Sequence, residues 1–245
     1  MTRVTIDAAG CSSPRGAGWS PPARSAIATE PRARAPARLA SVAEHDHEHE
    51  RAPGHDDGDA PELSEEELQR EAERLLRKRI ALSQIRQYGD PVLRMKAAEV
   101  ESFDDELART VERMTALMHD AEGIGLAATQ IGILRRVLVF SDDGEDRALV
   151  NPVLTDVGGA AEVDEEGCLS LGQVRVPVER RLEVTVEGKG VDGREVRLRL
   201  EGLSARVVQH EIDHLDGVLI VDRTDPDSRK RAMAQLRPRL LVGTR

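Results

Sequence analysis

Aromatic residues, cysteines and long apolar runs are all scarce in this sequence. Phe, Trp and Tyr make up 2% of the 245 residues, so the core must be built from Leu, Val, Ile, Ala and Met. No apolar run approaches the roughly 20 residues that a helix needs to cross a bilayer, and we expect no membrane segment. The only cysteines, Cys11 and Cys168, lie in stretches of very different composition. This argues against a disulfide framework and for a reducing, cytoplasmic setting.

Charged residues are abundant, and acids outnumber bases. Asp, Glu, Lys and Arg together make up 33% of the chain, the net charge is −10 and the pI is near 5.3. This balance argues against a nucleic-acid-binding surface over the whole protein, and we do not expect DNA as a partner. A local basic patch remains compatible with it, because the residues after Pro226 include six bases and one acid.

The first 61 residues lack the pattern of a folded domain. Residues 10–40 are rich in Pro, Ala, Gly, Ser and Arg without apolar periodicity, so they bury too little apolar surface to offset their chain entropy. Residues 44–59 contain four of the seven histidines of the chain. We interpret this stretch either as a solvated linker or as a loose metal-binding tract. Residues 1–40 superficially resemble an organelle transit peptide, and a translation start placed too far upstream is an alternative. We expect a disordered, low-complexity extension over residues 1–61.

Three helices are predicted outside the central part of the chain. Ser64 and Glu67 form a capping-box pattern at the start of a charged helix within residues 62–82. Residues 104–123 show apolar positions at helical spacing and end at Gly123. A last, basic helix begins at Asp227 and Ser228 and stops before Pro238, within a C-terminal piece of residues 226–245.

From Arg135 onward the pattern becomes that of β-strands. Residues 135–140 and 148–153 are typical of short buried strands, and residues 175–188 and 195–202 alternate apolar and polar side chains. Asp192 and Gly193 predict the turn between the last two strands. A helix with Ser204 as N-cap follows. Helices packed against a largely antiparallel sheet predict an α+β fold.

The sequence HEIDH, residues 210–214, places two histidines four residues apart with a glutamate after the first. On a helix these positions share one face, so both imidazoles can reach one metal ion. The motif resembles the metzincin pattern up to Gly217, but Ile220 stands where a third histidine belongs. No glutamate follows Glu211, which also excludes the thermolysin arrangement. A third ligand must come from upstream or from an aspartate.

Cys168 in EEGCLS, residues 165–170, is a candidate for that third ligand. One thiolate, two neutral imidazoles and one open position would form a tetrahedral site with room for a water. A lone cysteine is equally often a small buried apolar residue, and Cys168 on its own leaves both interpretations open.

A glycine-rich stretch, GIGLAATQ at residues 123–130, matches the letters of a dinucleotide-binding fingerprint. That interpretation needs a strand before the glycines, whereas a helix is predicted there. A tight backbone segment along which a substrate chain can lie fits better, with Gln130 as an amide donor towards the reaction centre.

GIGLAATQ, EGCLS and QHEIDH, in this order, resemble the three signature motifs of the peptide deformylase family, and QIRQYGDPVLR at residues 84–94 resembles the usual start of those enzymes. The resemblance runs from about residue 83 to 225 and implies a single catalytic domain there. It also implies a mixed, largely antiparallel sheet around a central metal-binding HExxH helix. The expected reaction removes the N-formyl group from the N-terminal methionine of nascent peptides, giving formate.

The resemblance also implies roles for individual residues. It makes Cys168, His210 and His214 the ligands of one Fe²⁺ ion, for which Zn²⁺, Ni²⁺ or Co²⁺ can substitute. Glu211 becomes the general base and then the general acid. The side chain of Gln130 and the backbone N–H of Leu169 would stabilise the oxyanion. Five residues are implied to bind the substrate: Gly123, Ile124, Gly125, Arg175 and Val207.

Two features depart from the family pattern. Gly172 stands where CLS is usually followed by an apolar residue and proline, which makes the loop near the substrate looser. The family also says nothing about an 80-residue N-terminal extension. In bacterial relatives the C-terminal helix approaches the ribosome, and the basic helix here would meet ribosomal RNA by charge, with a merely solvated helix face as the alternative.

Three rival functions fit the sequence less well. A broad metallopeptidase would carry a downstream His or Glu ligand. An inactive relative that binds ribosomes or formyl peptides would have lost a ligand or the acid/base, and all four residues are present. A metal-buffering protein built on HDHEHE, residues 45–50, would leave the three motifs unexplained.

Overall fold

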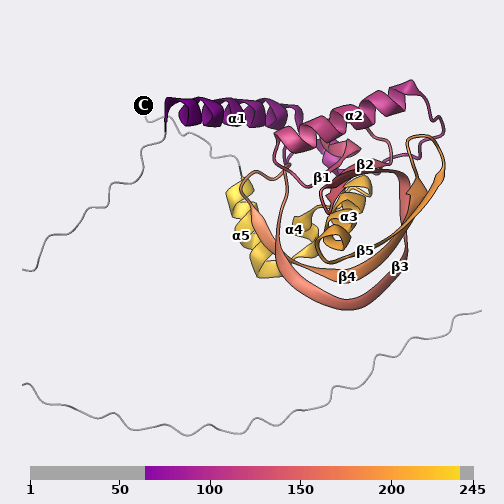
Figure 1. Ribbon diagram of the computed structural model, residues 1–245. Coiled ribbons are helices and arrows are strands. Elements are labelled where there is room, and N and C mark those ends of the chain that lie inside the picture. Colours follow the sequence, from indigo (N-terminus) through magenta and orange to yellow (C-terminus); the bar gives the residue numbers. More distant parts are fainter. Residues whose placement is uncertain (1–63, 238–245) are drawn as a thin grey trace, which may run out of the picture. The chain divides into compact units, whose positions relative to one another are not determined.

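The computed structural model describes residues 64–237, and the extension predicted over residues 1–61 lies outside them. The described residues form one five-stranded sheet, with helices packed against it (Figure 1). Within residues 64–237 no helix is both long and apolar enough to cross a membrane. The α+β class predicted from the sequence is confirmed.

The sheet is an antiparallel meander in which the strands keep their chain order, β1-β2-β3-β4-β5. Every neighbouring pair of strands is antiparallel, and parallel pairing is limited to an isolated bridge between Ala98 and Arg135. Strand β1 therefore lies at an edge. The strand bounds are β1 Gly125–Ala127, β2 Val137–Asp142, β3 Glu145–Gly167, β4 Arg175–Lys189 and β5 Glu195–Glu201.

Strand β3 is much longer than the short buried strand predicted at residues 148–153. It runs for 23 residues and pairs with β4 as far as Gly167 opposite Arg175, through three register shifts. The sequence pattern missed this length because most side chains from residue 155 to 165 are exposed, so they show no apolar alternation. At its far end β3 delivers the chain directly to Cys168. The predicted turn at Asp192 and Gly193 is confirmed between β4 and β5.

The N-terminal helices follow their predicted caps. Helix α1 (Glu65–Gln84) begins with the Ser64–Glu67 capping box. The 3₁₀ helix η1 (Pro91–Arg94) follows, and then α2 (Asp105–Asp120) with Asp104 as N-cap. Helix α2 buries the predicted apolar face against the sheet. It ends three residues before Gly123, because Glu122 takes the left-handed conformation that glycine usually supplies.

Helix α3 (Gly202–Leu215) carries HEIDH and begins three residues earlier than predicted. Ser204 is not its N-cap. Glu201 holds that position, since Gly202, at φ 56°, turns the chain straight from β5 into the helix. The hydroxyl of Ser204 instead donates to Asp142 at 2.6 Å.

The C-terminal part contains the short helix α4 (Ile220–Arg223) and then α5 (Pro226–Leu236). The N-cap of α5 is Asp225, not Asp227 or Ser228, because its carboxylate accepts from the backbone N–H groups of both of those residues. Proline at the first helical position has no N–H that would need a partner.

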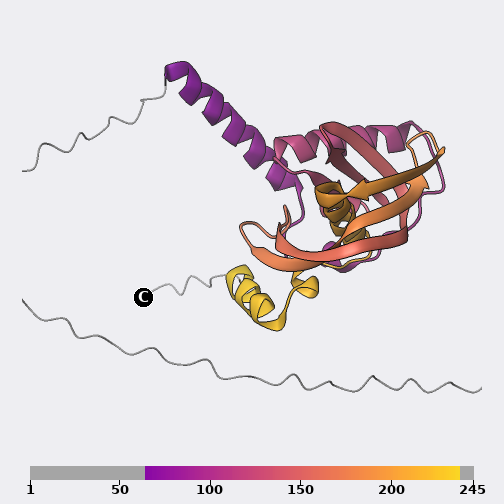
Figure 2. The ribbon, with the colours of Figure 1, turned by 60° about the horizontal axis from the view of Figure 1, so that its bottom comes forward.

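Helix α3 lies at the centre of the domain. Strands β3 and β4 curve around it in both views (Figures 1 and 2). Its apolar residues, among them Val208 and Leu215, pack against buried side chains of β2, β4 and β5. Cys168 belongs to a separate apolar cluster with Leu93, Leu171 and residues of α4 and α5. The metal-ligand candidates therefore come from two elements that the core holds together.

Candidate metal centre

Cys168, His210 and His214 converge at the heart of the domain. Each offers one ligand atom, and these three atoms all lie within 4.8 Å of one another. The thiol sulfur of Cys168 is 3.2 Å from Nε2 of His214. Cys168 and His214 are buried, and His210 is nearly so. Cys168 therefore lies beside both histidines, which is the position that the ligand interpretation of this residue expects.

Helix α3 presents the two imidazoles from one face, as the i, i+4 spacing predicts. Their ring centroids are 5.0 Å apart. Burial, together with the positive charge of His210, lowers the pKa of His214 well below its usual value. His214 is therefore neutral, which is the form in which imidazole binds a metal. Its Nδ1 atom is buried without a hydrogen-bond partner among the described residues.

Glu166 orients His210 from the strand that leads to Cys168. One carboxylate oxygen of Glu166 is 3.0 Å from Nδ1 of His210, which leaves Nε2 for a metal. Burial alone would raise the pKa of Glu166, but hydrogen bonds from His210 and Arg180 lower it to about 2. A carboxylate behind a histidine ligand is a recurrent feature of protein metal sites.

Glu211 points into the same space with one oxygen free. Its Oε2 atom is buried and has no partner among the described residues. Burial raises the pKa of Glu211 to about 7, although the charge of His210 works against this rise. An unpartnered buried carboxylate is costly, and its position beside three metal donors is what a general acid/base requires.

Gln130 approaches the thiolate from the 3₁₀ helix η2 (Ala128–Ile131), which follows β1 directly. Its amide oxygen accepts from the backbone N–H of Ala127 at 2.8 Å. This bond directs the amide nitrogen towards Ser170 Oγ at 3.2 Å and Cys168 Sγ at 3.7 Å. The donor end of Gln130 therefore faces the metal cluster. The arrangement of helix, β1 and 3₁₀ helix also removes the dinucleotide interpretation of GIGLAA, which needs a preceding strand.

The glycines of GIGLAATQ are required by close packing against the other two motifs. A Cβ atom added at Gly125 would lie 2.5 Å from Oε1 of Glu211 and 2.8 Å from Cγ1 of Val207. A Cβ at Gly123 would lie 2.8 Å from Cδ1 of Leu169. The backbone of residues 123–125 thus packs tightly against the side chains of three other predicted site residues, and side chains larger than glycine would not fit at positions 123 and 125.

Two predicted substrate contacts lie further out. Ile124 is 48% exposed on the edge strand side of the centre. Arg175 is exposed at the start of β4, where it pairs in register with Gly167. The structure therefore brings Arg175 close to the Cys168 loop but not to the metal donors themselves.

A buried ionic network lies behind the candidate ligands, and no sequence-based prediction included it. Arg180 contacts Glu166 at 2.9 Å and Asp213 of the HEIDH motif at 2.6 Å. Arg206 also donates to Glu166, at 2.8 Å, and Arg223 donates to Asp213 at 3.0 Å. A signal was present in β4, because Arg180 occupies an inward position in a row of valines.

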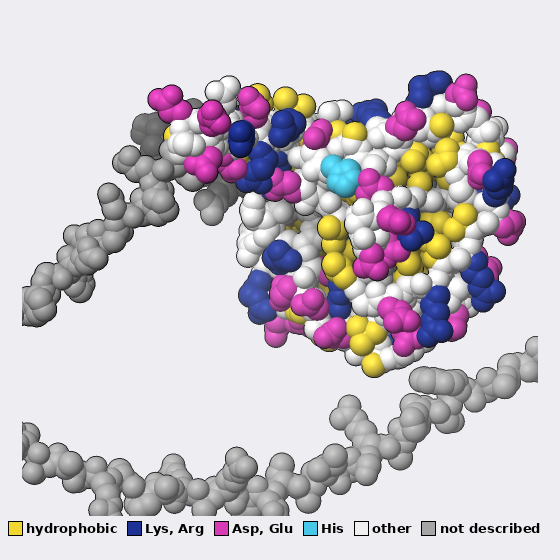
Figure 3. Space-filling model, in the orientation of Figure 1, with side chains coloured by type: hydrophobic (Ala, Val, Ile, Leu, Met, Phe, Trp, Pro, Cys, Tyr) yellow, Lys and Arg dark blue, Asp and Glu magenta, His cyan; other side chains and the backbone are white. Residues whose placement is uncertain are grey.

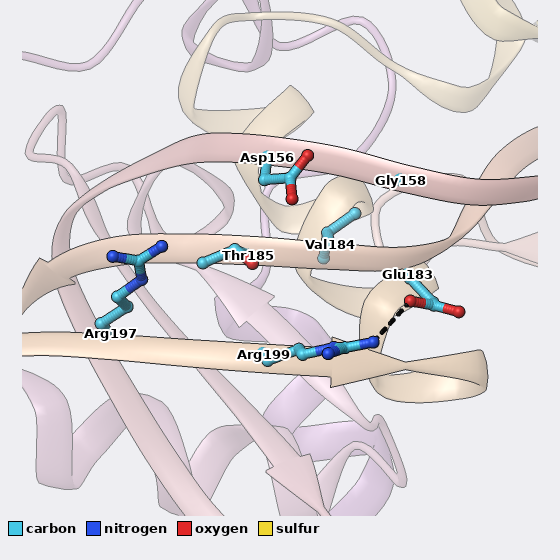
Figure 4. A pocket seen from close by; sticks show the side chains of 7 residues that line it. All are labelled: Asp156, Gly158, Glu183, Val184, Thr185, Arg197 and Arg199. Atoms are coloured by element: carbon cyan, nitrogen blue, oxygen red, sulfur yellow. Dashed lines mark hydrogen bonds and ion pairs between the residues drawn. The ribbon is translucent and has the colours of Figure 1, made fainter.

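One open hollow of the described residues lies away from these donors. It measures about 500 Å³ and lies over β3, β4 and β5, where Arg199 pairs with Glu183 (Figure 4). Its lining residues include none of the metal donors and neither cysteine nor histidine. The chemistry therefore points to the Cys168 cluster and not to this hollow.

Comparison with known proteins agrees with this site. A sequence model of the family described as polypeptide deformylase matches residues 82–230. The peptide deformylase of Thermotoga sp. (strain RQ2) is 46% identical over 145 residues, which are 59% of this chain and 88% of that protein. The crystal structure of peptide deformylase from Thermotoga maritima is 45% identical, with a TM-score of 0.57 over 58% of this chain and 97% of that one.

A further solved structure carries an inhibitor. The peptide deformylase from Synechococcus elongatus in complex with actinonin is 41% identical, with a TM-score of 0.60 over 62% of this chain and 84% of that one. The matched region holds all three motifs and every residue of the centre described above. The chain therefore belongs to the polypeptide deformylase family, and it is a metal-dependent hydrolase that removes the N-formyl group from newly synthesised proteins.

Proposed function

We propose that Cys168, His210 and His214 hold one divalent ion and that Glu211 is the acid/base of deformylation. The residues fit an ion because one thiolate and two imidazoles meet within 4.8 Å, which is a recognised donor set with a fourth position open. The buried, unpartnered Oε2 of Glu211, the residue that follows His210, is consistent with a polar occupant of this space. We propose Fe²⁺ as the native ion, with Zn²⁺, Ni²⁺ or Co²⁺ able to replace it.

A divalent ion bound by these ligands would supply Lewis acidity, which acidifies water and polarises the formyl carbonyl. Glu211 accepts the proton of the attacking water and later delivers it to the departing amine nitrogen. A C–O bond forms as the formyl C–N bond breaks, so the products are formate and a peptide with a free N-terminal methionine. The raised pKa of Glu211, about 7, suits a group that must both take and give a proton near neutrality.

Gln130 and Leu169 stabilise the negative charge that develops on the formyl oxygen. The amide nitrogen of Gln130 faces Cys168, and its orientation is set before substrate arrives by the bond from Ala127 to its oxygen. Leu169 directly follows Cys168, so its backbone N–H lies beside the same centre. Such donors act without reorganisation during the reaction, and each is typically worth about 10²–10³-fold in rate.

The substrate is a formyl-methionyl peptide that adds to the edge of the sheet. Strand β1 is an edge strand, so Gly123, Ile124 and Gly125 can pair with an extended chain. Val207 is buried one helical turn before Glu211 and borders Gly125, where an unbranched methionine side chain would lie. Arg175 would meet the peptide further towards its carboxyl end.

We propose that the enzyme works in the cytoplasm and near the ribosome. Helix α5 carries Arg229, Lys230 and Arg231 on consecutive positions, and all three are exposed. Basic side chains of this kind can meet ribosomal RNA through phosphate charge. Arg229 is partly neutralised by Asp222 at 3.3 Å, so the attraction comes mainly from the other two.

The single observation that carries the proposal is the convergence of Cys168, His210 and His214, whose ligand atoms all lie within 4.8 Å of one another. The test is formate release from a formyl-Met tripeptide by protein purified without oxygen, with the bound metal measured. Glu211→Ala is run beside it, and Glu165→Ala serves as the control, because Glu165 is an exposed carboxylate three residues before Cys168.

We expect the parent and Glu165→Ala to release formate and Glu211→Ala to keep its metal while losing activity. A metal-loaded parent that releases no formate would overturn the proposal and favour an inactive formyl-peptide-binding relative. Metal lost from Glu211→Ala would instead place that residue among the ligands.

A further inference from the structure

Helix α1 contacts the turn that leads into the substrate-binding segment, although the helix lies almost wholly outside the region shared with the family. The family match begins at residue 82, whereas α1 spans Glu65–Gln84. Only its last turn enters the core, through Ala81 and the partly buried Leu82. The remainder is largely exposed, and both acidic and basic side chains lie on its visible face (Figure 3).

Two basic residues of α1 converge on one carboxylate. Arg74 forms an ion pair with Oε1 of Glu122, and Nζ of Lys78 lies 2.6 Å from Oε2. Arg74 and Lys78 are four positions apart, so they share one face of the helix. Arg74 is itself held by Glu71, one turn earlier, at 2.6 Å and 2.8 Å. The hydrogen bond from Lys78 lowers the pKa of Glu122, which is therefore charged at neutral pH.

Glu122 forms the turn that leads from α2 into the substrate-binding segment. Its φ of 58° is in the left-handed region, which a glutamate rarely adopts. The N–H of Glu122 donates to His119 at 2.8 Å, and the N–H of Gly123 donates to Met118 at 2.9 Å. In helix ends of this type, the left-handed position is usually occupied by glycine. The turn sets the direction in which Gly123, Ile124 and Gly125 leave the helix.

The segment after this turn has little freedom to shift. An added Cβ at Gly123 would be 2.8 Å from Leu169, and one at Gly125 would be 2.5 Å from Glu211. The carbonyl oxygen of Ile124 also accepts from the N–H of Ser141 at 3.0 Å. Because these clearances are small, even a slight rotation at Glu122 would misalign the edge that receives the peptide, while the metal ligands, on α3 and directly after β3, would stay in place.

We propose that Arg74 and Lys78 are positioning residues, which hold Glu122 and so fix the substrate-binding edge for the formyl peptide. The inference rests on the proposed role of residues 123–125. It predicts an effect on substrate binding and not on chemistry, because neither basic residue approaches the metal donors or Glu211. The element involved is one that the family region does not contain.

The test is steady-state deformylation by the full chain carrying Arg74→Glu with Lys78→Glu. The substrate is a formyl-Met tripeptide with an amidated C terminus and uncharged side chains, so direct attraction to the new charges is absent. A second variant adds Glu122→Lys, which restores attraction with the signs exchanged. The control is Arg70→Glu, which changes charge on α1 at an exposed pair with Glu66. Metal content and thermal midpoint are measured for each protein.

We expect the double variant to raise KM about three- to tenfold at low salt, with kcat within about twofold, since exposed ion pairs are individually modest. The charge-exchanged variant should recover most of the loss, and about 0.5 M salt should shrink the difference. Arg70→Glu should match the parent. An unchanged KM, a fall in kcat alone, or no recovery on charge exchange would overturn the inference while leaving the deformylase activity of the parent intact. An inactive parent would overturn the proposed function instead.

Discussion

Nδ1 of His210 lies 3.0 Å from a carboxylate oxygen of Glu166, and this contact joins the metal centre to the buried ionic network behind it. Glu166 also accepts from Arg180 at 2.9 Å and from Arg206 at 2.8 Å. One carboxylate therefore contacts the proposed metal ligand His210 and two buried guanidinium groups. The strand that positions Cys168 and the helix that positions His210 are tied together by it, two residues from the cysteine.

Replacement of Glu166 by glutamine should weaken metal binding more than it weakens folding. The amide keeps the size of the side chain but gives His210 and the two arginines a neutral partner. Loss of such a carboxylate typically costs about 10–100-fold in metal affinity. Competition with a chelator measures the affinity, and Glu165→Gln, on the exposed neighbour, is the matched control. Equal affinities in Glu166→Gln and the parent would show that His210 is oriented by other contacts.

Replacement of Arg180 by methionine should destabilise the fold. Methionine fills the inward position of β4, but it leaves Glu166 and Asp213 short of a buried cationic partner. Breaking a buried ion pair by removing one member costs about 3–5 kcal/mol, and the remaining Arg206 and Arg223 should hold the loss near the lower value. Denaturant unfolding measures it. Arg181→Met, on the exposed neighbouring position, should stay within about 1 kcal/mol of the parent.

Alanine at Gly125 should damage activity with little effect on metal content. Its Cβ would lie 2.5 Å from Oε1 of Glu211, so the carboxylate or the β1 backbone must move. A displacement of this size at a reacting group costs about 10²-fold in rate. Gly158→Ala is the control, because an added Cβ there meets nothing within 4 Å. Formate release and metal content are measured for each variant. Full activity of Gly125→Ala would show that the backbone of β1 can shift to accept the added methyl group without displacing Glu211.

The sequence was informative where chemistry depends on spacing or on a local pattern. The i, i+4 histidines of HEIDH and the capping box at Ser64 follow from helix geometry alone, and both are confirmed. The nearness of Cys168 to His214, 46 positions away, could come only from the family resemblance. Long-range pairing has no local signal, because it depends on how β3 and β4 bring distant segments together.

Three further features escaped the sequence for separate physical reasons. The exposed half of β3 shows no apolar alternation, so its length was underestimated. Gly202 at positive φ starts α3 without a side-chain cap, which displaced the predicted N-cap from Ser204. The left-handed turn at Glu122 is contacted by Arg74 and Lys78 of α1, and the local sequence does not predict it.

The ion pair between Arg94 and Asp222 should make part of the free energy of unfolding depend on pH in the acidic range. Burial alone would raise the pKa of Asp222, but hydrogen bonds from Arg94 and from the N–H of Leu219 lower it below the usual value. A carboxyl group with a lowered pKa in the folded state contributes stability above its unfolded pKa of about 3.9. That contribution is lost as the pH falls through the lower folded value.

Asp222→Asn keeps an acceptor for the N–H of Leu219 but loses the charge. We expect it to be less stable than the parent by up to about 1 kcal/mol at pH 7, with a difference that shrinks towards zero below about pH 3. Arg94→Met should remove the part of this contribution that comes from Arg94, whereas the part that comes from the N–H of Leu219 and from Arg229 should remain. Unfolding by denaturant at several pH values measures this. Protonation of the metal ligands affects all three proteins alike, so a difference that stays constant with pH would exclude the ion pair as its source.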